Sequence, residues 1–261
     1  MTIRIATWNV QRPSASGPLN EARLRLINDW VNGERAPEIW VLTETRNSID
    51  LGEGWHSLSS LPIPGYHKDG ETLVTIWSRW PISPVSITRF TACAEINIPG
   101  LGCSLIYGTV IPWDKDRGPT NLIGTPRWEE HYRQVQFQTA EWITLGQQYP
   151  THFKCIAGDF NQHRGSLGSY RDKRSVKLVT DALEASSLQC VTVDPIGHEK
   201  LTKPLVDHIC ISREAACVST VTVLPFDSIP VTGLSDHHLV VVSIQREVAA
   251  IDPCSASEVR G

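Results

Sequence analysis

The chain has 261 residues, of which 41% are hydrophobic and 20% are charged, and these values are ordinary for a globular protein. A formal net charge of −4 and a pI near 6.1 argue against a broad basic surface for duplex nucleic acid, although local basic loops could still bind it. The length allows a sizeable core without requiring two domains. We expect one domain over 1–246 and a frayed tail over 247–261.

The cysteines and the apolar runs bear on the compartment. The seven cysteines are scattered, mostly within strand-like runs, and have no CxxC spacing that would indicate zinc or a redox pair. No apolar run approaches the length of a membrane span, and the chain enters a strand-like run at Ile3 without a leader segment. We therefore expect reduced core thiols in a cytoplasmic protein.

Strand-like runs outnumber helix-like runs along the chain. In chain order, the predicted strands cover 3–10, 39–45, 72–78, 84–90, 94–98, 102–111, 153–158, 189–194, 205–211, 216–225 and 238–245. The predicted helices cover 20–33 with Asn20 as N-cap, 126–148 opened by Thr125 and Pro126, and 174–186. A doubly wound parallel sheet alternates strand and helix, so this pattern favours two packed sheets with helices outside.

Five of the strand-like segments carry an acidic or amide side chain at or near one end. These residues are Asn9, Glu44, Asp159, Asp207 and Asp236. One such residue is explained equally well by a turn, since Asp and Asn favour turns. Buried acids are costly unless they are paired, hydrogen-bonded or bound to a cation, and a divalent ion relieves the repulsion of several at once. The five together therefore indicate a cation site at one sheet edge.

The segment from Ile156 to Asn161 is the most informative of them. On an extended chain, residues i and i+2 point to the same face, so Asp159 and Asn161 would project together. A carboxylate can hold or deprotonate a water molecule, and a carboxamide can donate to an oxyanion. The pair therefore predicts hydrolytic chemistry.

These motifs resemble those of the endonuclease/exonuclease/phosphatase family, which includes DNase I-like nucleases, abasic-site endonucleases, sphingomyelinases and inositol polyphosphate 5-phosphatases. The resemblance runs in the family's order from residue 3 to about residue 245. It implies a four-layer α/β sandwich, with two packed mixed or antiparallel sheets flanked by helices. The matching segments are Thr7–Val10, Thr43–Thr45, Trp77–Ile82, Gly158–Asn161, Val206–Ile209 and Ser235–His237.

The resemblance also implies a role for each matched residue. It implies that Glu44 binds Mg²⁺, with Mn²⁺ as an alternative, and that Asn9 and Asp236 assist. It implies that Asp159 orients and deprotonates the attacking water and that Asn161 contacts a phosphoryl oxygen. His237 would donate to the phosphate and stabilise its developing charge, while Asp207 keeps the imidazole oriented and charged.

The chain departs from the family pattern after the strand ending near Ile106. Many members place a His or Tyr there, two or three residues before a Pro, but this chain has Thr109 and Val110. Neither can act as an acid near neutral pH. Thr109 could donate a hydrogen bond to substrate, Tyr107 shares its face, and His131 is a more distant substitute for the missing acid.

Loops are expected to select the substrate. The candidate loops are 11–19, 46–71, 112–125 and 162–174, and the last is basic, so we expect Arg164 to bind a substrate phosphate. A solvated loop is the alternative. Arg79 could fix a loop or bind a ligand, and Trp55 and Trp113 could stack on a base, with packing the favoured role.

The leading hypothesis is a Mg²⁺-dependent phosphodiesterase or nuclease acting on DNA or RNA as a monomer. A hydrolase of a small or lipid-linked phosphate ester is the second reading. A non-catalytic binding module on the same scaffold is the third, and the complete set of motif residues speaks against it.

Overall fold

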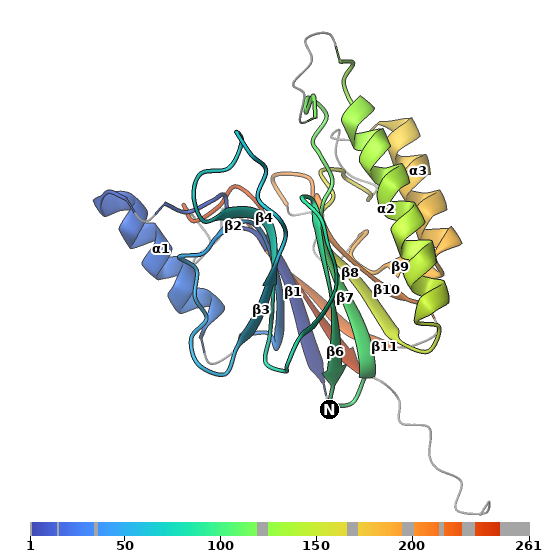
Figure 1. The fold of residues 1–261 in the computed structure, drawn as a ribbon, viewed down its shortest axis with the longest axis horizontal. Helices are drawn as coiled ribbons and strands as arrows, with labels where there is room; N and C mark the ends of the chain where they lie inside the picture. The colour runs from blue at the N-terminus through green and yellow to red at the C-terminus, as the bar shows by residue number, and fades with distance from the viewer. Residues whose placement is uncertain are drawn as a thin grey trace, which may run out of the picture.

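The computed structural model describes residues 2–14, 16–33, 36–118, 125–165, 172–194, 201–213, 217–225 and 233–245, with backbone alone at 217–219. Two six-stranded sheets pack face to face, in the orders β11-β12-β1-β2-β4-β3 and β5-β6-β7-β8-β10-β9. Helix α1 covers the outer face of the first sheet, and α2 and α3 cover the second (Figure 1). The predicted four-layer sandwich is confirmed.

The elements, in chain order, are β1 (Ile3–Asn9), α1 (Pro18–Val31), β2 (Ile39–Arg46), β3 (His56–Ser59), β4 (Glu71–Ser78), β5 (Ser83–Ile87), β6 (Thr91–Ile98), β7 (Gly102–Val110), α2 (Glu129–Gln148), β8 (Phe153–Asp159), α3 (Lys173–Ala185), β9 (Leu188–Cys190), β10 (Asp207–Ser212), β11 (Cys217–Leu224) and β12 (Leu239–Gln245).

The strand directions bring distant segments to one edge of the sandwich. β1 runs parallel to β2, and β7 runs parallel to β8. β10 is antiparallel to β8 and places Asp207 opposite Asp159, while β12 is antiparallel to β1. The ends of β1, β2 and β8 therefore meet the starts of β10 and β12 at the same edge.

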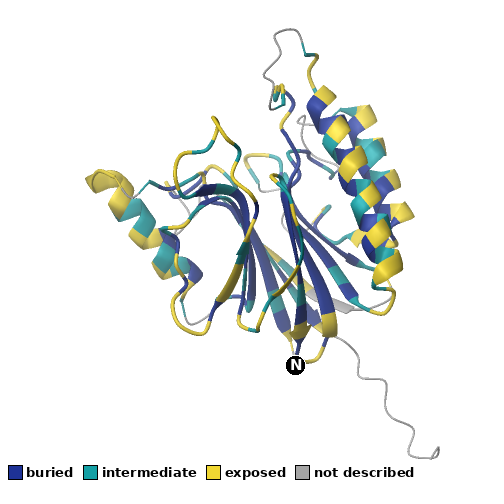
Figure 2. Cartoon of the chain, viewed as in Figure 1, coloured by how far each residue is buried: buried dark blue, intermediate teal, exposed yellow. Residues whose placement is uncertain are grey.

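The core between the sheets follows the two-residue period of the strands. Ile5, Val41, Ala157 and Ile209 are fully buried there, and Figure 2 shows the buried strands facing each other across this layer. Alternate residues on the outer faces, such as Trp8, pack under the helices. The same alternation, continued to the strand ends, decides which polar residues face the interior.

Two helices begin at other residues than the sequence predicted. α1 begins at Pro18 after Gly17, so Asn20 lies inside the helix and is not its N-cap. Proline suits the first helical turn because its missing N–H would have no partner there. α2 begins only at Glu129, because Trp128 takes a left-handed backbone with φ 70°.

The edge strand β3 was missed by sequence analysis. His56–Ser59 is mostly exposed and pairs only with β4, so its sequence has no apolar alternation that would reveal it. The predicted tail 247–261 lies outside the described residues. Among the described helices, none is long and apolar enough to cross a membrane.

Candidate active site

Three polar side chains at the common edge point into the space between the sheets. Asn9 ends β1, Asp159 ends β8 and Asp207 begins β10, each in the phase of the inward-facing apolar residues of its strand. Asn9 has no exposed surface, and the two aspartates are each 1% exposed. Two acids this deeply buried need a compensating charge.

Asp159 is held by a set of hydrogen bonds. Its Oδ2 accepts from Asn9 Nδ2 at 3.1 Å and from Asn161 Nδ2 at 3.0 Å, and its Oδ1 accepts from the Asn161 backbone N at 2.8 Å. The preceding residue must be glycine, because a Cβ on Gly158 would lie 1.9 Å from the Thr109 carbonyl oxygen. The close approach of β7 to β8 therefore fixes the position of Asp159.

Asp207 and His237 form the second part of the site. His237 Nδ1 lies 2.7 Å from Asp207 Oδ2, while Asp207 Oδ1 is buried with no hydrogen-bond partner. Burial alone would lower the pKa of His237, but the carboxylates of Asp207 and Asp159 outweigh it and raise this pKa to about 10. The surrounding carboxylates therefore favour the protonated form of His237.

The charges in this cluster also act on Asp159. Burial, with the neighbouring carboxylate of Asp207, raises the pKa of Asp159 to about 7, even though His237 acts in the opposite direction. A carboxylate that titrates near neutral pH is suited to accept a proton from water. Electrostatics thus supports the role of general base for Asp159.

Glu44 and its neighbours depart from extended geometry. Among the described residues, six residues other than glycine have a positive φ, and four of them lie at this edge: Gln11, Arg12, Glu44 and Asn161. Such backbone is costly and collects at functional sites. Arg12 Nε lies 3.5 Å from Glu44 Oε2.

Asp236 lies on the solvent side of the cluster. Its side chain is 52% exposed; it accepts a hydrogen bond from Gln11 Nε2 and lies 3.6 Å from Lys203 Nζ. His237 Nε2 is 3.7 Å from Asp236 Oδ1. The imidazole therefore lies between a buried and an exposed carboxylate.

The donor set suits a hard divalent cation. One ligand atom from each of Asp159, Asp207 and His237 lies within 4.8 Å of the others, and Glu44 is close enough to contribute to the raised pKa of Asp159. Carboxylate and amide oxygens are the ligands that Mg²⁺ and Mn²⁺ prefer. Among the described residues, Asp207 Oδ1 is buried without a hydrogen-bond partner, and a nearby cation would compensate its charge. The carboxylates and the amide oxygen at this edge therefore fit the implied metal, whereas His237, whose raised pKa favours the protonated form, is not suited to be a ligand.

A cleft of about 730 Å³ opens beside Glu44 and Asn161. Its wall contains four basic side chains, namely Arg12, Arg89, Lys115 and Arg117. Aromatic side chains of Tyr66, Phe90 and Trp113 line it as well. Arg12 lies over the Tyr66 ring at 4.5 Å, and Trp113 is 46% exposed.

Tyr107 and Thr109 do not reach this cleft. They share a face of β7, as predicted, but it is the outer face under α2, where Tyr107 Oη donates to Glu141 Oε2 at 2.5 Å and Thr109 Oγ1 donates to Gln138 Oε1 at 2.7 Å. Because inward positions alternate with outward ones, the inward residues here are Gly108 and Val110. The geometry gives neither hydroxyl a contact with substrate.

Arg164 is likewise engaged elsewhere. Its guanidinium donates to Gln162 Oε1 at 3.2 Å and to Thr180 Oγ1 of α3 at 3.1 Å, so it ties the loop after β8 to that helix. The rest of the predicted basic loop is divided, because Arg171 lies outside the described residues and Arg174 packs over the Tyr132 ring at 4.1 Å. Arg164 has no place at the cleft.

Asn161 orients Asp159 in this structure. Its Nδ2 donates to the Ile111 carbonyl at 3.0 Å and to Asp159, so both amide protons have acceptors. No proton is left for a phosphoryl oxygen unless one of these bonds is exchanged.

Four other candidate residues make structural contacts away from the site. His208 bonds Thr192 and the Gln162 carbonyl, and His238 bonds the Lys203 carbonyl, so both face away from the site as predicted. Arg79 stacks on Trp55 at 4.0 Å, and Trp55 is buried, which accords with the packing role favoured for it.

His131 is part of the scaffold and does not replace the missing acid. Its Nδ1 donates to the Pro112 carbonyl at 2.8 Å, and its Nε2 accepts from Ser175 Oγ at 2.6 Å, so the ring joins α2 to α3 and to the loop after β7. Burial lowers the pKa of His131 to about 4, and the ring is neutral at pH 7.

The buried ring predicts a pH dependence of stability. His131 binds a proton near pH 6.5 when unfolded but only near pH 4 when folded, so the unfolded state holds more protons between these values. Stability should therefore fall as pH decreases through this window, by on the order of 3 kcal/mol from this group. Urea unfolding at pH 4.5 and 7 should show a smaller difference for His131→Asn, and an unchanged difference would contradict this assignment.

Several cleft residues escaped the sequence analysis. Tyr66 lies in one turn and the adjacent Arg89 and Phe90 lie in another, so no shared spacing in the sequence links them. Only the packing of the two sheets brings them together.

Comparisons with known proteins agree with this geometry. The sequence model of the endonuclease/exonuclease/phosphatase family matches residues 6–237. No curated protein sequence matches the chain.

Solved structures of the same architecture are similar over nearly the whole chain. The endonuclease domain of TRAS1, a telomere-specific non-LTR retrotransposon, has 16% identity and a TM-score of 0.62, covering 94% of this chain and 99% of that one. The 3′ phosphatase NExo from Neisseria, solved with a product DNA hairpin, has 15% identity and a TM-score of 0.64, covering 93% and 99%. The human Nocturnin catalytic domain has 17% identity and a TM-score of 0.66, covering 94% and 93%.

The family match spans most of the chain and includes every residue of the buried carboxylate–histidine cluster. The protein belongs to the endonuclease/exonuclease/phosphatase family and is a phosphoester hydrolase of that type.

Proposed function

We propose that the protein is a divalent-metal-dependent phosphodiesterase that hydrolyses nucleic acid. The observation that carries this proposal is the cleft beside Glu44 and Asn161, which combines four basic side chains with three aromatic rings. Cations along a groove track a phosphate backbone, and aromatic rings stack on unpaired bases. A small phosphate ester needs a cation at only one place, whereas the four basic side chains of the cleft, here called the basic rim, offer several. The basic rim therefore favours a polymeric substrate.

The metal would be held by Glu44, with Asn9 and Asp236 assisting, and Mg²⁺ is the proposed ion, with Mn²⁺ as the alternative. A bound divalent ion supplies charge neutralisation on the phosphoryl oxygens. Glu44 has a left-handed backbone, so its side chain departs from the alternation of β2 at the site edge. This departure suits Glu44 to the role of metal ligand. Asp236 is exposed and can turn toward an ion without breaking a buried contact.

The protein's own groups divide the remaining work. Asp159, held by Asn9 and Asn161, orients the attacking water and accepts its proton. The charged His237, held by Asp207, donates from Nε2 to a non-bridging oxygen and stabilises the negative charge that develops. Tyr107, Thr109 and His131, the candidates for the missing family acid, are all engaged in or under α2, so none of the three protonates the leaving oxygen.

Loss of the metal ligand should abolish most of the activity. Glu44→Gln keeps the size of the side chain but removes its charge, and we expect the rate with bis-p-nitrophenyl phosphate to fall by at least ~10²-fold at low Mg²⁺. Raising Mg²⁺ or Mn²⁺ should recover part of it, and EDTA should abolish hydrolysis by the unmodified protein. The matched control is Glu129→Gln, an exposed acid in the first turn of α2. A metal-independent rate would contradict the proposal.

The basic rim should matter for polymers and not for small esters. Arg89→Ala combined with Lys115→Ala removes two cations from the cleft, and we expect KM for a single-stranded oligonucleotide to rise by about 10-fold or more while hydrolysis of bis-p-nitrophenyl phosphate stays unchanged. Lys177→Ala, on the exposed face of α3, is the matched control for loss of charge.

A screen of substrates decides between the two enzyme readings. Plasmid DNA, single-stranded DNA, RNA and phosphorylated headgroups would be supplied with Mg²⁺ or Mn²⁺, and we expect turnover of one of the nucleic acids. Turnover of small or lipid-linked esters alone would replace this proposal with the second reading. An absence of turnover with any substrate would favour a binding module.

A further inference from the structure

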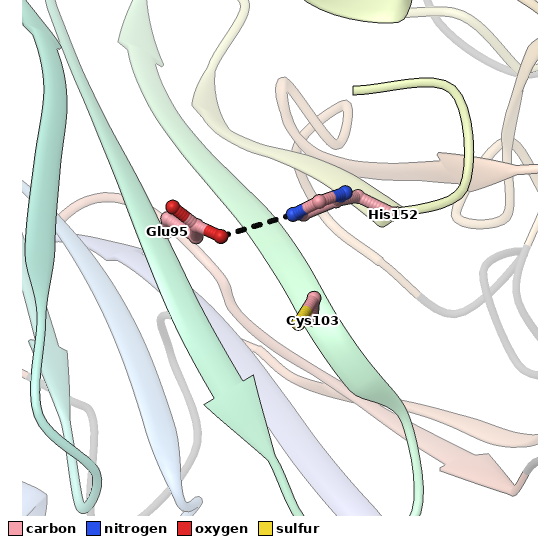
Figure 3. A group of neighbouring side chains, drawn as sticks. All are labelled: Glu95, Cys103 and His152. Atoms are coloured by element: carbon pink, nitrogen blue, oxygen red, sulfur yellow. Dashed lines mark hydrogen bonds and ion pairs between the residues drawn. The ribbon is translucent and has the colours of Figure 1, made fainter.

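A second cluster of ligand-type side chains lies at the other end of the second sheet. Glu95 is on β6, Cys103 is on β7, and His152 directly precedes β8 (Figure 3). Ser104 pairs with Phe153, so Cys103 and His152 are neighbours across the parallel strands. The seven residues of β8 separate His152 from the catalytic edge, a distance of about 20 Å along the strand.

The three side chains converge on one small volume. One donor atom from each lies within 4.8 Å of the other two, and His152 Nε2 is 3.0 Å from Glu95 Oε1. All three occupy the outer face of the sheet, as Cys103 and Glu95 share the phase of Leu105, which packs under α2. The helix has ended at Gln148 before this point, so it leaves Cys103 exposed.

We propose that Glu95, Cys103 and His152 form a binding site for a borderline-soft divalent metal ion, Zn²⁺ foremost. Zinc takes thiolate, imidazole and carboxylate ligands at about 2.0–2.3 Å in a tetrahedron, which requires the donors to be roughly 3.3–3.8 Å apart. The present separations of up to 4.8 Å would shorten by about 1 Å when the ion binds. Water completes the fourth position, since the cluster faces solvent.

The chemistry of the donors separates this site from the catalytic edge. A thiolate favours zinc-like ions over Mg²⁺ and Ca²⁺, whereas the catalytic cluster offers carboxylates, amide groups and one imidazole. Binding displaces the Cys103 thiol proton to solvent and moves the imidazole proton of His152 to Nδ1. Among the described residues, Nδ1 of His152 is buried without a hydrogen-bond partner, so this tautomer costs the desolvation of one N–H, which the metal–ligand bonds must exceed.

Two neighbours complete the surroundings. The Tyr149 ring packs edge-on against His152 at 5.0 Å and steadies the imidazole plane. Lys154 is the nearby cation, and its Nζ donates to the His152 carbonyl at 3.3 Å. Its charge opposes metal binding, and replacing it should therefore not weaken the site.

Cobalt spectroscopy tests the proposal on the full chain. Reduced, EDTA-stripped protein would be titrated with Co²⁺ in excess Mg²⁺, which occupies the catalytic edge. We expect a sulfur-to-cobalt charge-transfer band that saturates at one equivalent and disappears when Zn²⁺ is added. Cys103→Ser should abolish the band, and His152→Ala and Glu95→Gln should each raise the Kd for Co²⁺ at least about 10-fold.

Matched variants exclude other sources of the band. Cys190→Ser removes a thiol outside the cluster, Glu44→Gln alters the catalytic edge, and Lys154→Gln removes the nearby cation. All three should keep the band at undiminished affinity. The proposal is overturned if the unmodified protein gives no band, if Cys103→Ser retains it, or if neither His152→Ala nor Glu95→Gln weakens it.

Discussion

Asp159→Asn is expected to lower the rate of phosphodiester hydrolysis by about 10²–10⁴-fold, because an amide cannot accept a proton from water. The carboxylate is 1% exposed and is fixed by Asn9 and Asn161, so the substitution removes a charge and a base without changing size. The rate is measured with bis-p-nitrophenyl phosphate and an oligonucleotide at saturating Mg²⁺. Asp181→Asn, an exposed acid on α3, serves as control.

The same substitution should not unfold the protein. Asp159 lies opposite Asp207 in the strand register, and both are buried, so removal of one charge relieves repulsion. This relief offsets the loss of the hydrogen bonds that an amide NH2 cannot accept from the three N–H donors around Asp159, so the melting temperature of Asp159→Asn in EDTA at pH 8 should stay close to that of the unmodified protein. A low rate with a lowered melting temperature would indicate misfolding, and a near-normal rate in folded protein would refute the role of base.

Most of the fold could be predicted because its elements leave local patterns in the sequence. Eleven of the twelve strands could be predicted because their residues alternate or form apolar runs, whereas the exposed edge strand His56–Ser59 has neither property. Helix starts depended on backbone choices at Gly17 and Trp128 that side-chain spacing does not reveal.

The catalytic edge was predictable for a related reason. Asn9, Asp159 and Asp207 continue the inward phase of apolar residues on their strands, so the two-residue period that makes the core also aims them at one another. The phase of β7 could not be assigned in this way. Its residues are apolar or small on both faces, and only the packed sheets show that Tyr107 and Thr109 face α2.

Substrate contacts were the least predictable part. In the sequence, the basic loop 162–174 predicted Arg164 as a ligand of a substrate phosphate. In the structure, the Arg164 guanidinium donates to Gln162 and to Thr180 of α3, so it does not reach the cleft. The cleft draws Arg12 and Lys115 from the candidate loops 11–19 and 112–125, but Arg89 comes from a turn outside all four candidate loops, and the sheet order brings these segments together. Loop composition therefore says less about recognition than the position of each loop above the strand ends.

His237→Ala is expected to lower the hydrolysis rate by about 10²–10³-fold, because it removes the charged donor that stabilises the developing oxyanion. It also leaves Asp207 buried and without its partner, which should cost about 3 kcal/mol of stability. Rates and urea unfolding would be measured together. His238→Gln, which changes the neighbouring imidazole that bonds the Lys203 carbonyl, is the control.

A double-mutant cycle separates the role of Asp207 from that of His237. Asp207→Asn alone should reduce the rate, because the imidazole loses both its orientation and the carboxylate that raises its pKa. In the His237→Ala background, the same change should have little further effect on rate and should recover part of the lost stability, since a buried unpaired charge is removed. If the two rate losses multiplied instead, Asp207 would act on the reaction independently of His237.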